Sequence, residues 1–276
     1  MTPEPGTAAP LALTPELREA VRNIAATDQL LVAMDFDGTM APIVPHADDA
    51  RPLPRAAAAF AGLAALPRTT TALISGRALA SLRGVASPPA ESLLIGSHGA
   101  EAWLGPESAG LELDEDQRTL LAEVRGILAG IAGEAPGTML EDKPAGVVLH
   151  TRQAADDVAE DAVAAARSLL EDRKGVFLKN GKRVLETSVV HASKGEAVAF
   201  LRQAAGATAI LFAGDDTTDE DAFARLGPGD VGVKVGLDFT QAQYRVEAPI
   251  HVAELLEALL AARSSAVGEG DGTPAG

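Results

Sequence analysis

Two short acidic segments carry the residues best suited to chemistry. Asp35 and Asp37 lie two residues apart in the sequence DFDGT, which directly follows the apolar run Leu30–Met34. On an extended backbone, residues two apart point to the same side, so both carboxylates can face one ligand. Neighbouring carboxylates at the end of a buried strand repel each other and need a counter-charge. Magnesium is the expected counter-ion, because it prefers hard oxygen ligands.

The second acidic segment is GDDTTDED at 214–221, and it also follows an apolar run. Helix N-termini favour acidic residues, and Thr217 is a suitable N-cap, so the later acidic residues could serve a helix alone. That explanation does not cover Asp215 and Asp216, which come directly after a buried strand and a glycine. For DFDGT, the alternative is an aspartate-glycine turn that merely ends a strand.

Two smaller segments offer groups that bind phosphate. Ser75-Gly76-Arg77 follows the apolar run Thr71–Ile74 and combines a hydroxyl, a flexible backbone and a guanidinium. By itself this segment is better explained as a serine that caps a helix. Lys194 stands at the expected start of a helix, where the helix dipole disfavours a cation. Its position therefore suggests a role other than helix stability.

These segments follow the strands of one expected sheet. Short apolar runs with flanking glycines are typical of strands buried on both faces of a parallel sheet. The alternation of such runs with helical patterns predicts a doubly wound, Rossmann-like α/β fold, in which ligands bind beyond the carboxyl ends of the strands. The expected strands begin at Leu30, Thr71, Leu93, Thr208 and Val231, and the expected helices lie near 14–27, 54–66, 192–205, 217–226 and 252–263.

Residues 106–188 interrupt this alternation with two helical patterns and three strand-like runs. This pattern of helices and strands is typical of a small α+β domain inserted into a larger α/β domain. We therefore expect a cap domain that is joined to the core by two hinges. The low-complexity ends of the chain are expected to be mobile. The predicted bounds are 14–105 and 189–263 for the core, 106–188 for the cap, and 1–13 and 264–276 for the tails.

The composition excludes several classes of function. The chain has 276 residues, of which 47% are hydrophobic and 22% charged, as in a globular protein. Its formal net charge of −16 disfavours nucleic acids and anionic membranes as partners. The absence of cysteine excludes disulfides, cysteine-ligated metals and thiol catalysis. Because we find no signal segment at the N-terminus and no apolar run of membrane-spanning length, we expect a soluble, cytoplasmic protein.

Taken in order, the four segments resemble the motifs of the haloacid dehalogenase superfamily of phosphotransferases. DFDGT at 35–39 resembles the first motif, Ser75 the second and Lys194 the third, and GDDTTD at 214–219 resembles the fourth. Further segments narrow the resemblance to the trehalose-6-phosphate phosphatases, from about Leu30 to about Leu260. They are GSHGAE at 96–101, EDKP at 141–144, LHTR at 149–152, GKRVLE at 181–186 and GDDTTDEDAF at 214–223.

The resemblance implies a Mg²⁺-dependent, two-step phosphoryl transfer from trehalose 6-phosphate, the last step of trehalose biosynthesis. Asp35 would attack phosphorus and form an aspartyl-phosphate. Asp37 would act first as general acid and then as general base. The implied catalytic residues are Asp35, Asp37 and Lys194, the phosphate-binding residues are Thr39, Ser75, Arg77 and Lys194, and the metal ligands are Asp35, Asp37, Asp215 and Asp219.

The same resemblance implies that the cap recognises the sugar. Glu141, Lys143 and Glu186 offer hydrogen-bond donors and acceptors that suit sugar hydroxyls, and Arg77 and His98 are further expected substrate contacts. Without the family, a solvated surface explains the three cap residues better. The alternatives are a phosphatase of another sugar phosphate such as sucrose 6-phosphate, a phosphomutase, or a catalytically silent regulatory domain. We expect a monomer with a functional link to a trehalose-6-phosphate synthase.

Overall fold

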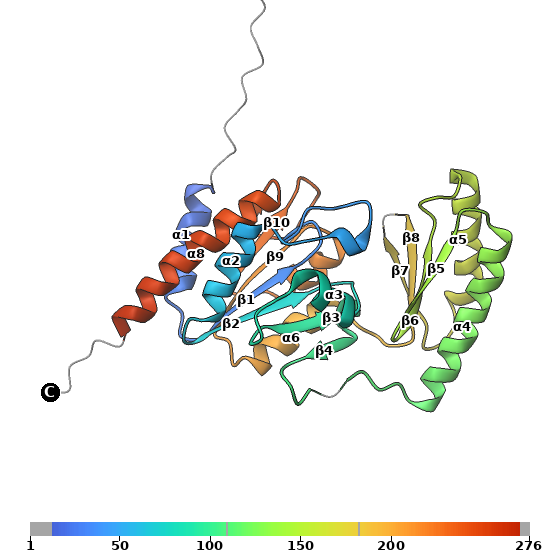
Figure 1. The fold of residues 1–276 in the computed structure, drawn as a ribbon, viewed down its shortest axis with the longest axis horizontal. Helices are drawn as coiled ribbons and strands as arrows, with labels where there is room; N and C mark the ends of the chain where they lie inside the picture. Colours follow the sequence, from blue (N-terminus) through green and yellow to red (C-terminus); the bar gives the residue numbers. More distant parts are fainter. Residues whose placement is uncertain (1–12, 109, 182, 271–276) are drawn as a thin grey trace, which may run out of the picture.

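The computed structural model describes residues 13–108, 110–181 and 183–270, which form two sheets with their helices (Figure 1). The larger sheet has the strand order β11-β10-β9-β1-β2-β3-β4, and the smaller has the order β5-β6-β8-β7. In the larger sheet only β3 and β4 are antiparallel, whereas every pair in the smaller sheet is antiparallel. This architecture confirms the expected α/β fold with a further, smaller α+β part.

The elements of the larger sheet and of the helices around it come from both ends of the chain. The strands are β1 (Leu30–Asp35), β2 (Thr69–Ile74), β3 (Leu93–Gly96), β4 (Glu101–Trp103), β9 (Ala209–Gly214), β10 (Val231–Val235) and β11 (Tyr244–Val246). The helices are α1 (Pro15–Ala25), α2 (Pro54–Ala64), α3 (Leu79–Ala86), α6 (Lys194–Ala204), α7 (Glu220–Phe223) and α8 (Pro249–Gly270). The smaller part contains α4 (Glu115–Glu134), β5 (Met139–Lys143), β6 (Gly146–His150), α5 (Asp156–Leu170), β7 (Phe177–Gly181) and β8 (Val184–Ser188).

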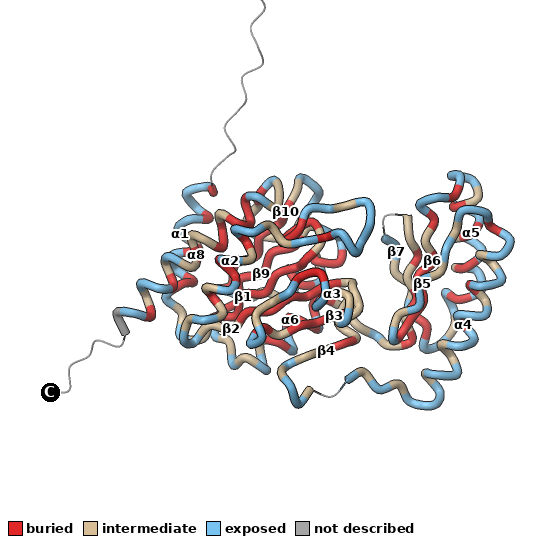
Figure 2. Tube along the Cα trace, in the orientation of Figure 1, coloured by how far each residue is buried: buried red, intermediate tan, exposed pale blue. Residues whose placement is uncertain are grey.

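The central strand β1 is buried along its whole length because helices cover both faces of the sheet (Figure 2). Leu30, Val32 and Met34 belong to the apolar cluster formed with α1, α2 and α8. Leu31 and Ala33, which alternate with them, belong to the cluster formed with α6 and α7. The continuous apolar run therefore reflects a strand with two buried faces, as the period-2 geometry of strands requires.

The strand order brings the expected site residues to one edge of the sheet. β1 lies between β2 and β9, and all three are parallel. Asp35 is level with Ile74 of β2, and Met34 is level with Ala213 of β9. The residues that follow these strands, Ser75 and Asp215, must therefore lie beside Asp35. Ligands of open α/β sheets bind at this kind of position.

The smaller sheet has one buried face and one that faces the larger part (Figure 1). Helices α4 and α5 cover the first face by packing on Val147, Leu149 and Leu185. Val148 pairs with both Glu141 and Glu186 across the strands. Because directly paired residues point to the same side of a sheet, these carboxylates lie on the uncovered face.

The structure corrects the expected start of the C-terminal tail. Residues 264–270 continue helix α8, although the sequence analysis placed them in a mobile tail. Arg263 is buried and donates to the carbonyl of Ala25 at 2.9 Å, and Val267, one turn further on, is also buried. These contacts stabilise the last turns of α8, although the sequence of residues 264–270 shows no helical periodicity. The remaining tail residues, 1–12 and 271–276, lie outside the described residues.

The helix α3 and the strands β4, β5 and β11 were not expected from the sequence. Each of these strands lies at an edge of its sheet, and two of them have only three residues. Short strands of this kind lack the continuous apolar run that reveals a central strand. Within the described residues, no helix is long and apolar enough to cross a membrane.

Candidate active site

Three carboxylates meet at the carboxyl edge of the larger sheet. Asp35 is the last residue of β1, Asp215 directly follows β9, and Asp219 ends the short 3₁₀ helix Thr217–Asp219. One carboxylate oxygen from each lies within 4.8 Å of the others. Asp35 and Asp219 are only 4% and 0% exposed, so water stabilises their charges little. The cluster therefore depends on nearby cations.

Lys194 supplies one of these cations. It is the first residue of α6, where Ser193 caps the helix by accepting a hydrogen bond from the Glu196 backbone N–H at 3.1 Å. The Lys194 ammonium donates to Asp35 Oδ1 and to Asp219 Oδ1, both at 2.7 Å. Burial alone would lower the pKa of Lys194, but the two carboxylates outweigh it and hold the pKa above its usual value. Lys194 is therefore charged, which explains a cation at a helix N-terminus.

The rest of the cluster fits a divalent cation. Three carboxylates against one ammonium leave an excess of two negative charges. Burial, with repulsion between neighbouring carboxylates, raises the pKa of Asp35 well above its usual value and that of Asp215 to about 6. Asp215 Oδ1 is buried and has no hydrogen-bond partner among the described residues. Hard carboxylate oxygens of this kind are the ligands that Mg²⁺ prefers.

Two glycines permit the close approach of these carboxylates. Gly38 has a φ of +80°, and a Cβ there would lie 2.1 Å from Asp215 Oδ2. A Cβ at Gly214 would lie 2.2 Å from the carboxyl carbon of Asp219. No side chain fits at either position without displacing a carboxylate. Both glycines are therefore required because the carboxylates pack against them. Gly38 is required for a second reason, which is its positive φ in the turn.

Asp37 lies apart from the three-carboxylate cluster and pairs with Arg77. Arg77 Nε and Nη2 each donate to one oxygen of the Asp37 carboxylate at 2.6 Å. Ser75 Oγ accepts a hydrogen bond from the backbone N–H of Arg77 at 3.1 Å. Thr39 Oγ1 is buried without a hydrogen-bond partner among the described residues. Asp37, Thr39 and Ser75 thus lie at the predicted edge, while the guanidinium of Arg77 is occupied by Asp37.

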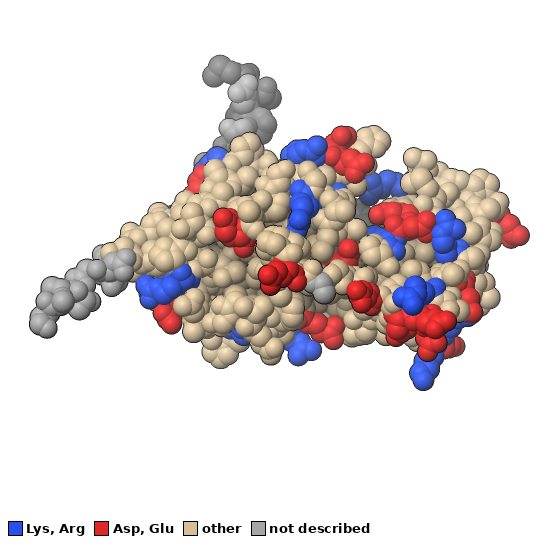
Figure 3. All heavy atoms as spheres, turned by 60° about the horizontal axis from the view of Figure 1, so that its bottom comes forward, with Lys and Arg blue, Asp and Glu red and all other residues tan. Residues whose placement is uncertain are grey.

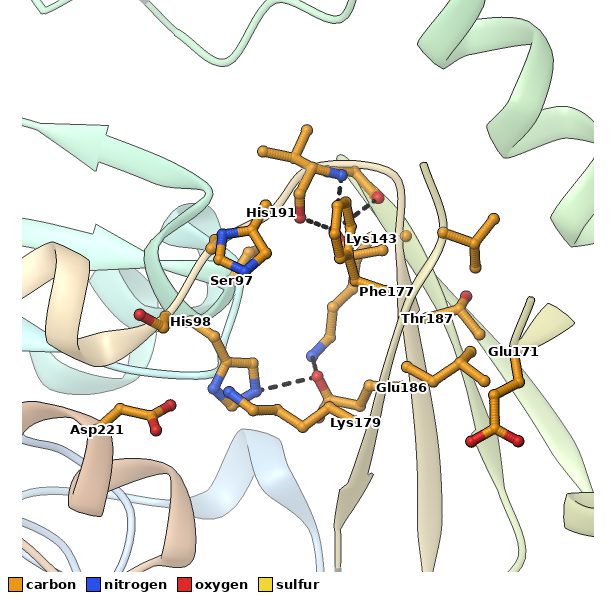
Figure 4. Close-up of a pocket in the computed structure, with 18 of the residues that line it drawn as sticks. Ser97, His98, Lys143, Glu171, Phe177, Lys179, Glu186, Thr187, His191 and Asp221 are labelled. Carbon is orange, nitrogen blue, oxygen red and sulfur yellow. Dashed lines mark hydrogen bonds and ion pairs between the residues drawn. The ribbon is translucent and has the colours of Figure 1, made fainter. Parts of the chain in front are cut away.

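Side chains of the smaller sheet contact the larger part at Lys143 and Glu186 (Figure 4). Lys143 Nζ donates to the carbonyl oxygen of Gly76 at 2.9 Å and to Glu186 Oε2 at 3.3 Å. His98 Nε2 lies 3.0 Å from the same Glu186 oxygen, although its alignment is too poor for a hydrogen bond. Burial alone would raise the pKa of Glu186, but His98 and Lys143 outweigh it and lower the pKa to about 2. Two predicted substrate residues, Lys143 and Glu186, therefore form an ion pair, and a third, His98, whose pKa is lowered by burial, lies against it.

Glu141 lies apart from this contact, although it is on the same face of the sheet. Its Oε2 is 2.8 Å from His150 Nε2, and this hydrogen bond lowers the pKa of Glu141. His150 pairs with Met139 and Val184 in the register, two residues along from the row of Glu141 and Glu186. We did not predict His150 as a site residue, and its place in the segment LHTR was its only signal in the sequence.

Lys234 is a further residue that sequence reasoning missed. It is buried on β10, and its ammonium donates to the carbonyl oxygens of Asp215 at 2.7 Å and Asp216 at 3.3 Å. It thereby holds the loop that carries the acidic cluster. The only indication of its role in the sequence was the position of a lysine within the otherwise apolar segment VGVKV. Asp216 itself caps the following 3₁₀ helix, because its Oδ1 accepts from the Thr217 N–H at 2.7 Å.

Glu101 was also missed, and it holds the turn that presents His98. Its carboxylate accepts hydrogen bonds from Ser97 Oγ at 2.6 Å and from the Leu79 N–H at 3.3 Å. Ser97 and His98 both have positive φ, at 49° and 56°. Consecutive non-glycine residues rarely adopt this conformation, so the surrounding contacts must stabilise it. The turn places the His98 ring where a Cβ at Gly76 would be only 2.5 Å away.

Asp215→Asn is expected to raise the melting temperature of the metal-free protein by about 2–5 °C. The pKa of Asp215 is about 6 in the folded protein, above its ordinary value of 3.8. The folded state therefore holds this proton more tightly, and stability is lost as the pH rises from about 3.8 to about 6 and stays lost at neutral pH. Asparagine removes that penalty. Thermal unfolding in EDTA at about pH 7.5 measures the effect, with exposed Asp172→Asn as the matched control.

Magnesium provides the second half of this test. Added Mg²⁺ should raise the melting temperature of the wild type, because a ligand that binds only the folded state stabilises it. Asp215→Asn should gain clearly less, because the variant lacks one ligand. Equal stabilisation of both proteins by Mg²⁺ would show that Asp215 does not contribute to a metal site.

The fold and the site together define a class of protein. A buried aspartate ends the central strand, a serine follows the next strand, a lysine begins a helix, and acidic residues follow the neighbouring strand on the other side. This is the arrangement of the haloacid dehalogenase-like proteins. Within that class the chain belongs to the trehalose-phosphatase family, whose family model matches residues 33–252.

Comparison with individual proteins agrees with this assignment. The chain is 33% identical over 244 residues to a trehalose-phosphate phosphatase of Mycobacterium avium, covering 83% of this chain and 61% of the relative. It is 31% identical over 245 residues to a bifunctional trehalose-6-phosphate synthase/phosphatase of Thermoproteus tenax, covering 86% and 33%. The C-terminal domain of a Candida albicans trehalose-6-phosphate phosphatase shares the fold, with a TM-score of 0.77, 24% identity, and coverage of 93% and 99%. The chain thus spans about three fifths of the mycobacterial relative.

Proposed function

We propose that this protein is a Mg²⁺-dependent phosphatase that hydrolyses trehalose 6-phosphate to trehalose and phosphate. The observation that carries the proposal is the buried Asp35, which is paired with Lys194 beside two further carboxylates. Lys143 and Glu186 of the smaller sheet lie against the same edge, where they can contact a sugar. The trehalose-phosphatase family and the relatives named above support this substrate.

The proposed reaction begins with attack by a carboxylate oxygen of Asp35 on phosphorus. An oxygen–phosphorus bond forms to Asp35 as the bond to the sugar oxygen breaks, and Asp37 protonates that oxygen. Asp37 then takes a proton from a water molecule, which attacks the phosphorus of the aspartyl-phosphate. The bond to Asp35 breaks, and inorganic phosphate leaves. Lys194 stays beside Asp35 and offsets negative charge in both steps.

Asp37 needs a proton for the first step, and Arg77 controls its environment. The bidentate pair fixes the orientation of the Asp37 carboxylate. A bound phosphate dianion competes for the same guanidinium. We propose that Arg77 shifts part of its hydrogen bonding to phosphate, so that Asp37 becomes free to carry a proton. Ser75 and the unpartnered hydroxyl of Thr39 supply further hydrogen bonds to phosphate.

Asp35, Asp215 and Asp219 would hold the Mg²⁺ ion, together with the backbone carbonyl of Asp37. When bound, the ion neutralises charge between the carboxylates and the incoming phosphate. Asp219 already accepts hydrogen bonds at both oxygens, from Lys194 and from the Asp216 N–H. These bonds fix Asp219 in place, so it would order the site as well as face the ion, while Asp35 and Asp215 offer the freer oxygens.

The smaller part, from about residue 106 to 188, would act as the cap that selects the sugar. Lys143 donates and Glu186 accepts hydrogen bonds, and both functions are needed for sugar hydroxyls. On the face shown in Figure 3, basic and acidic side chains border a hollow between the two parts. The bifunctional name of the Thermoproteus tenax relative supports a functional link to a trehalose-6-phosphate synthase.

A panel of phosphate esters tests the proposed function. Phosphate release should depend on Mg²⁺, should stop in excess EDTA, and should favour trehalose 6-phosphate clearly over glucose 6-phosphate and sucrose 6-phosphate. Equal turnover of the three sugars would refute the specificity while leaving a phosphatase. Preference for sucrose 6-phosphate would favour that alternative. No release from any ester would favour a catalytically silent regulatory domain.

A further inference from the structure

A cavity of about 450 Å³ lies beside the edge strand β7 and the chain segment that connects β8 to α6, and residues of both the smaller and the larger part line it. Its volume is within the range of pockets that bind small molecules. Glu186 and Lys143 line it, but Asp35 and Asp37 do not. The cavity therefore begins at the proposed sugar-binding residues and extends away from the nucleophile. We call it the hinge chamber.

Lys179 is a charged residue of the hinge chamber that has no role in the proposed reaction (Figure 4). It lies on β7 and pairs with Glu186 of β8 in the register. Glu186 in turn pairs with Val148, which pairs with Glu141 on β5. Residues paired in this way share one face of the sheet. Lys179 thus completes the row of polar side chains that includes two proposed sugar contacts.

Among the hydrogen bonds and ion pairs within the part of the chain that the structure describes, Glu186 is engaged by Lys143 and none involves the Lys179 ammonium. Burial lowers the pKa of Lys179, while Asp221 of the larger part raises it and Lys194 lowers it. A half-buried ammonium without a partner has three donors for a ligand.

The charges that line the hinge chamber are balanced. On the side of the small sheet that faces the larger part, Lys143 and Lys179 face two acidic residues, which are Glu186 and Asp221. An anion would meet the carboxylates, and a cation would meet the ammonium groups. A neutral ligand with many hydroxyls can donate to the carboxylates and accept from the ammonium groups. The lining therefore favours a polyhydroxylated, uncharged group.

An aromatic wall completes the hinge chamber. The rings of Phe177 and His191 are 5.0 Å apart and meet edge to face at 73°. Phe177 is 39% exposed although it lies between the two parts of the molecule. Ligand pockets combine such apolar surfaces with a few well-placed polar groups. The apolar C–H face of a sugar ring fits a wall of this kind.

We propose that the hinge chamber binds the sugar ring farther from the phosphate, and that Lys179 determines specificity by donating hydrogen bonds to the hydroxyls of that ring. This inference rests on the proposed function and deepens it. Phosphate would sit at Asp35, and the ring that carries it would contact Lys143 and Glu186. The second ring would extend past Glu186 into the hinge chamber. A monosaccharide phosphate would leave the chamber empty and would make no use of Lys179.

The test compares Lys179→Met with the wild type on trehalose 6-phosphate and on glucose 6-phosphate. The ratio of the two kcat/KM values should fall at least about tenfold in the variant, because a hydrogen bond from a charged donor is lost only for the disaccharide. Lys179→Arg keeps a cationic donor and should restore part of the ratio. Lys174→Met is the matched control, because Lys174 is exposed in the turn before β7 and lies outside the chamber lining. Its ratio should equal that of the wild type.

Three results would overturn the inference, and they are distinguishable. A wild type that does not prefer trehalose 6-phosphate to glucose 6-phosphate would refute the proposed function itself. A wild type with that preference and a Lys179→Met variant with an unchanged ratio would refute only the role of the chamber. Equal losses on both substrates, with no rescue by Lys179→Arg, would show that Lys179 supports the structure. Melting temperatures of all variants identify any loss that is due to unfolding.

Discussion

Asp35→Asn is expected to reduce the release of phosphate from trehalose 6-phosphate by at least about a thousandfold. Asparagine keeps the shape of the side chain and can still accept the hydrogen bond from Lys194, but it is not a nucleophile. The fold should be retained, because burial already raises the pKa of Asp35 and the neutral amide relieves repulsion within the cluster. Phosphate release under saturating substrate measures the loss, and thermal unfolding checks the fold.

The control for this prediction is Asp172→Asn, which changes an exposed aspartate after α5 and should leave turnover as in the wild type. Retention of a tenth of the wild-type activity by Asp35→Asn would show that another group attacks phosphorus. A large loss of both activity and melting temperature would instead indicate that Asp35 holds the edge of the sheet together, and the nucleophile assignment would then lack support.

Lys143→Ala and Glu186→Gln are expected to separate sugar recognition from the chemistry. Each should lower kcat/KM for trehalose 6-phosphate by about tenfold to a hundredfold, since each removes a charged hydrogen bond to the sugar. The loss on p-nitrophenyl phosphate should be much smaller, because that ester has no sugar to contact these side chains. The pKa of Glu186 is about 2, so its carboxylate is charged throughout the assay range and the loss should not vary between about pH 6 and pH 8.

Asp142→Ala is the matched control for these two variants. Asp142 lies next to both Glu141 and Lys143 on β5, but it points to the other side of the sheet and pairs with the exposed Arg125 at 2.8 Å. It should therefore leave both substrates unaffected. Parallel losses on trehalose 6-phosphate and p-nitrophenyl phosphate would mean that Lys143 and Glu186 support the core site through Gly76 and His98, and sugar recognition would be refuted.

Local sequence patterns were sufficient to predict which side chains would gather at one edge of the larger sheet. Asp35 ends and Asp215 follows a strand that is buried on both faces, and such a strand is recognisable from a few consecutive apolar residues. Since parallel strands all end at the same edge, the sequence also implied that Ser75 and both aspartates would lie close together. The register of β1 with β2 and β9 confirms that proximity.

Local sequence patterns could not predict which charged side chains of the site pair with each other. Arg77 and Asp37 are 40 residues apart, and nothing in either segment indicates that the guanidinium pairs with that carboxylate. Lys234 and Lys179 were missed because surface lysines are common and burial depends on what covers a strand. Their roles follow from the position of β10 beside β9 and of β7 beside β8.

The sequence by itself determined the alternation of strands and helices in the larger part, the four segments at the carboxyl edge of its sheet and the presence of an interrupting α+β segment. Those features depend on interactions between near neighbours in the chain, such as alternation, helix capping and glycine at a turn. Only the tertiary structure decided which charges pair, how Lys143 and Glu186 meet Gly76 and His98, and that a chamber lies behind them. Such contacts join segments that are tens of residues apart, and their energies depend on burial, which arises only when the sheets and helices have packed together.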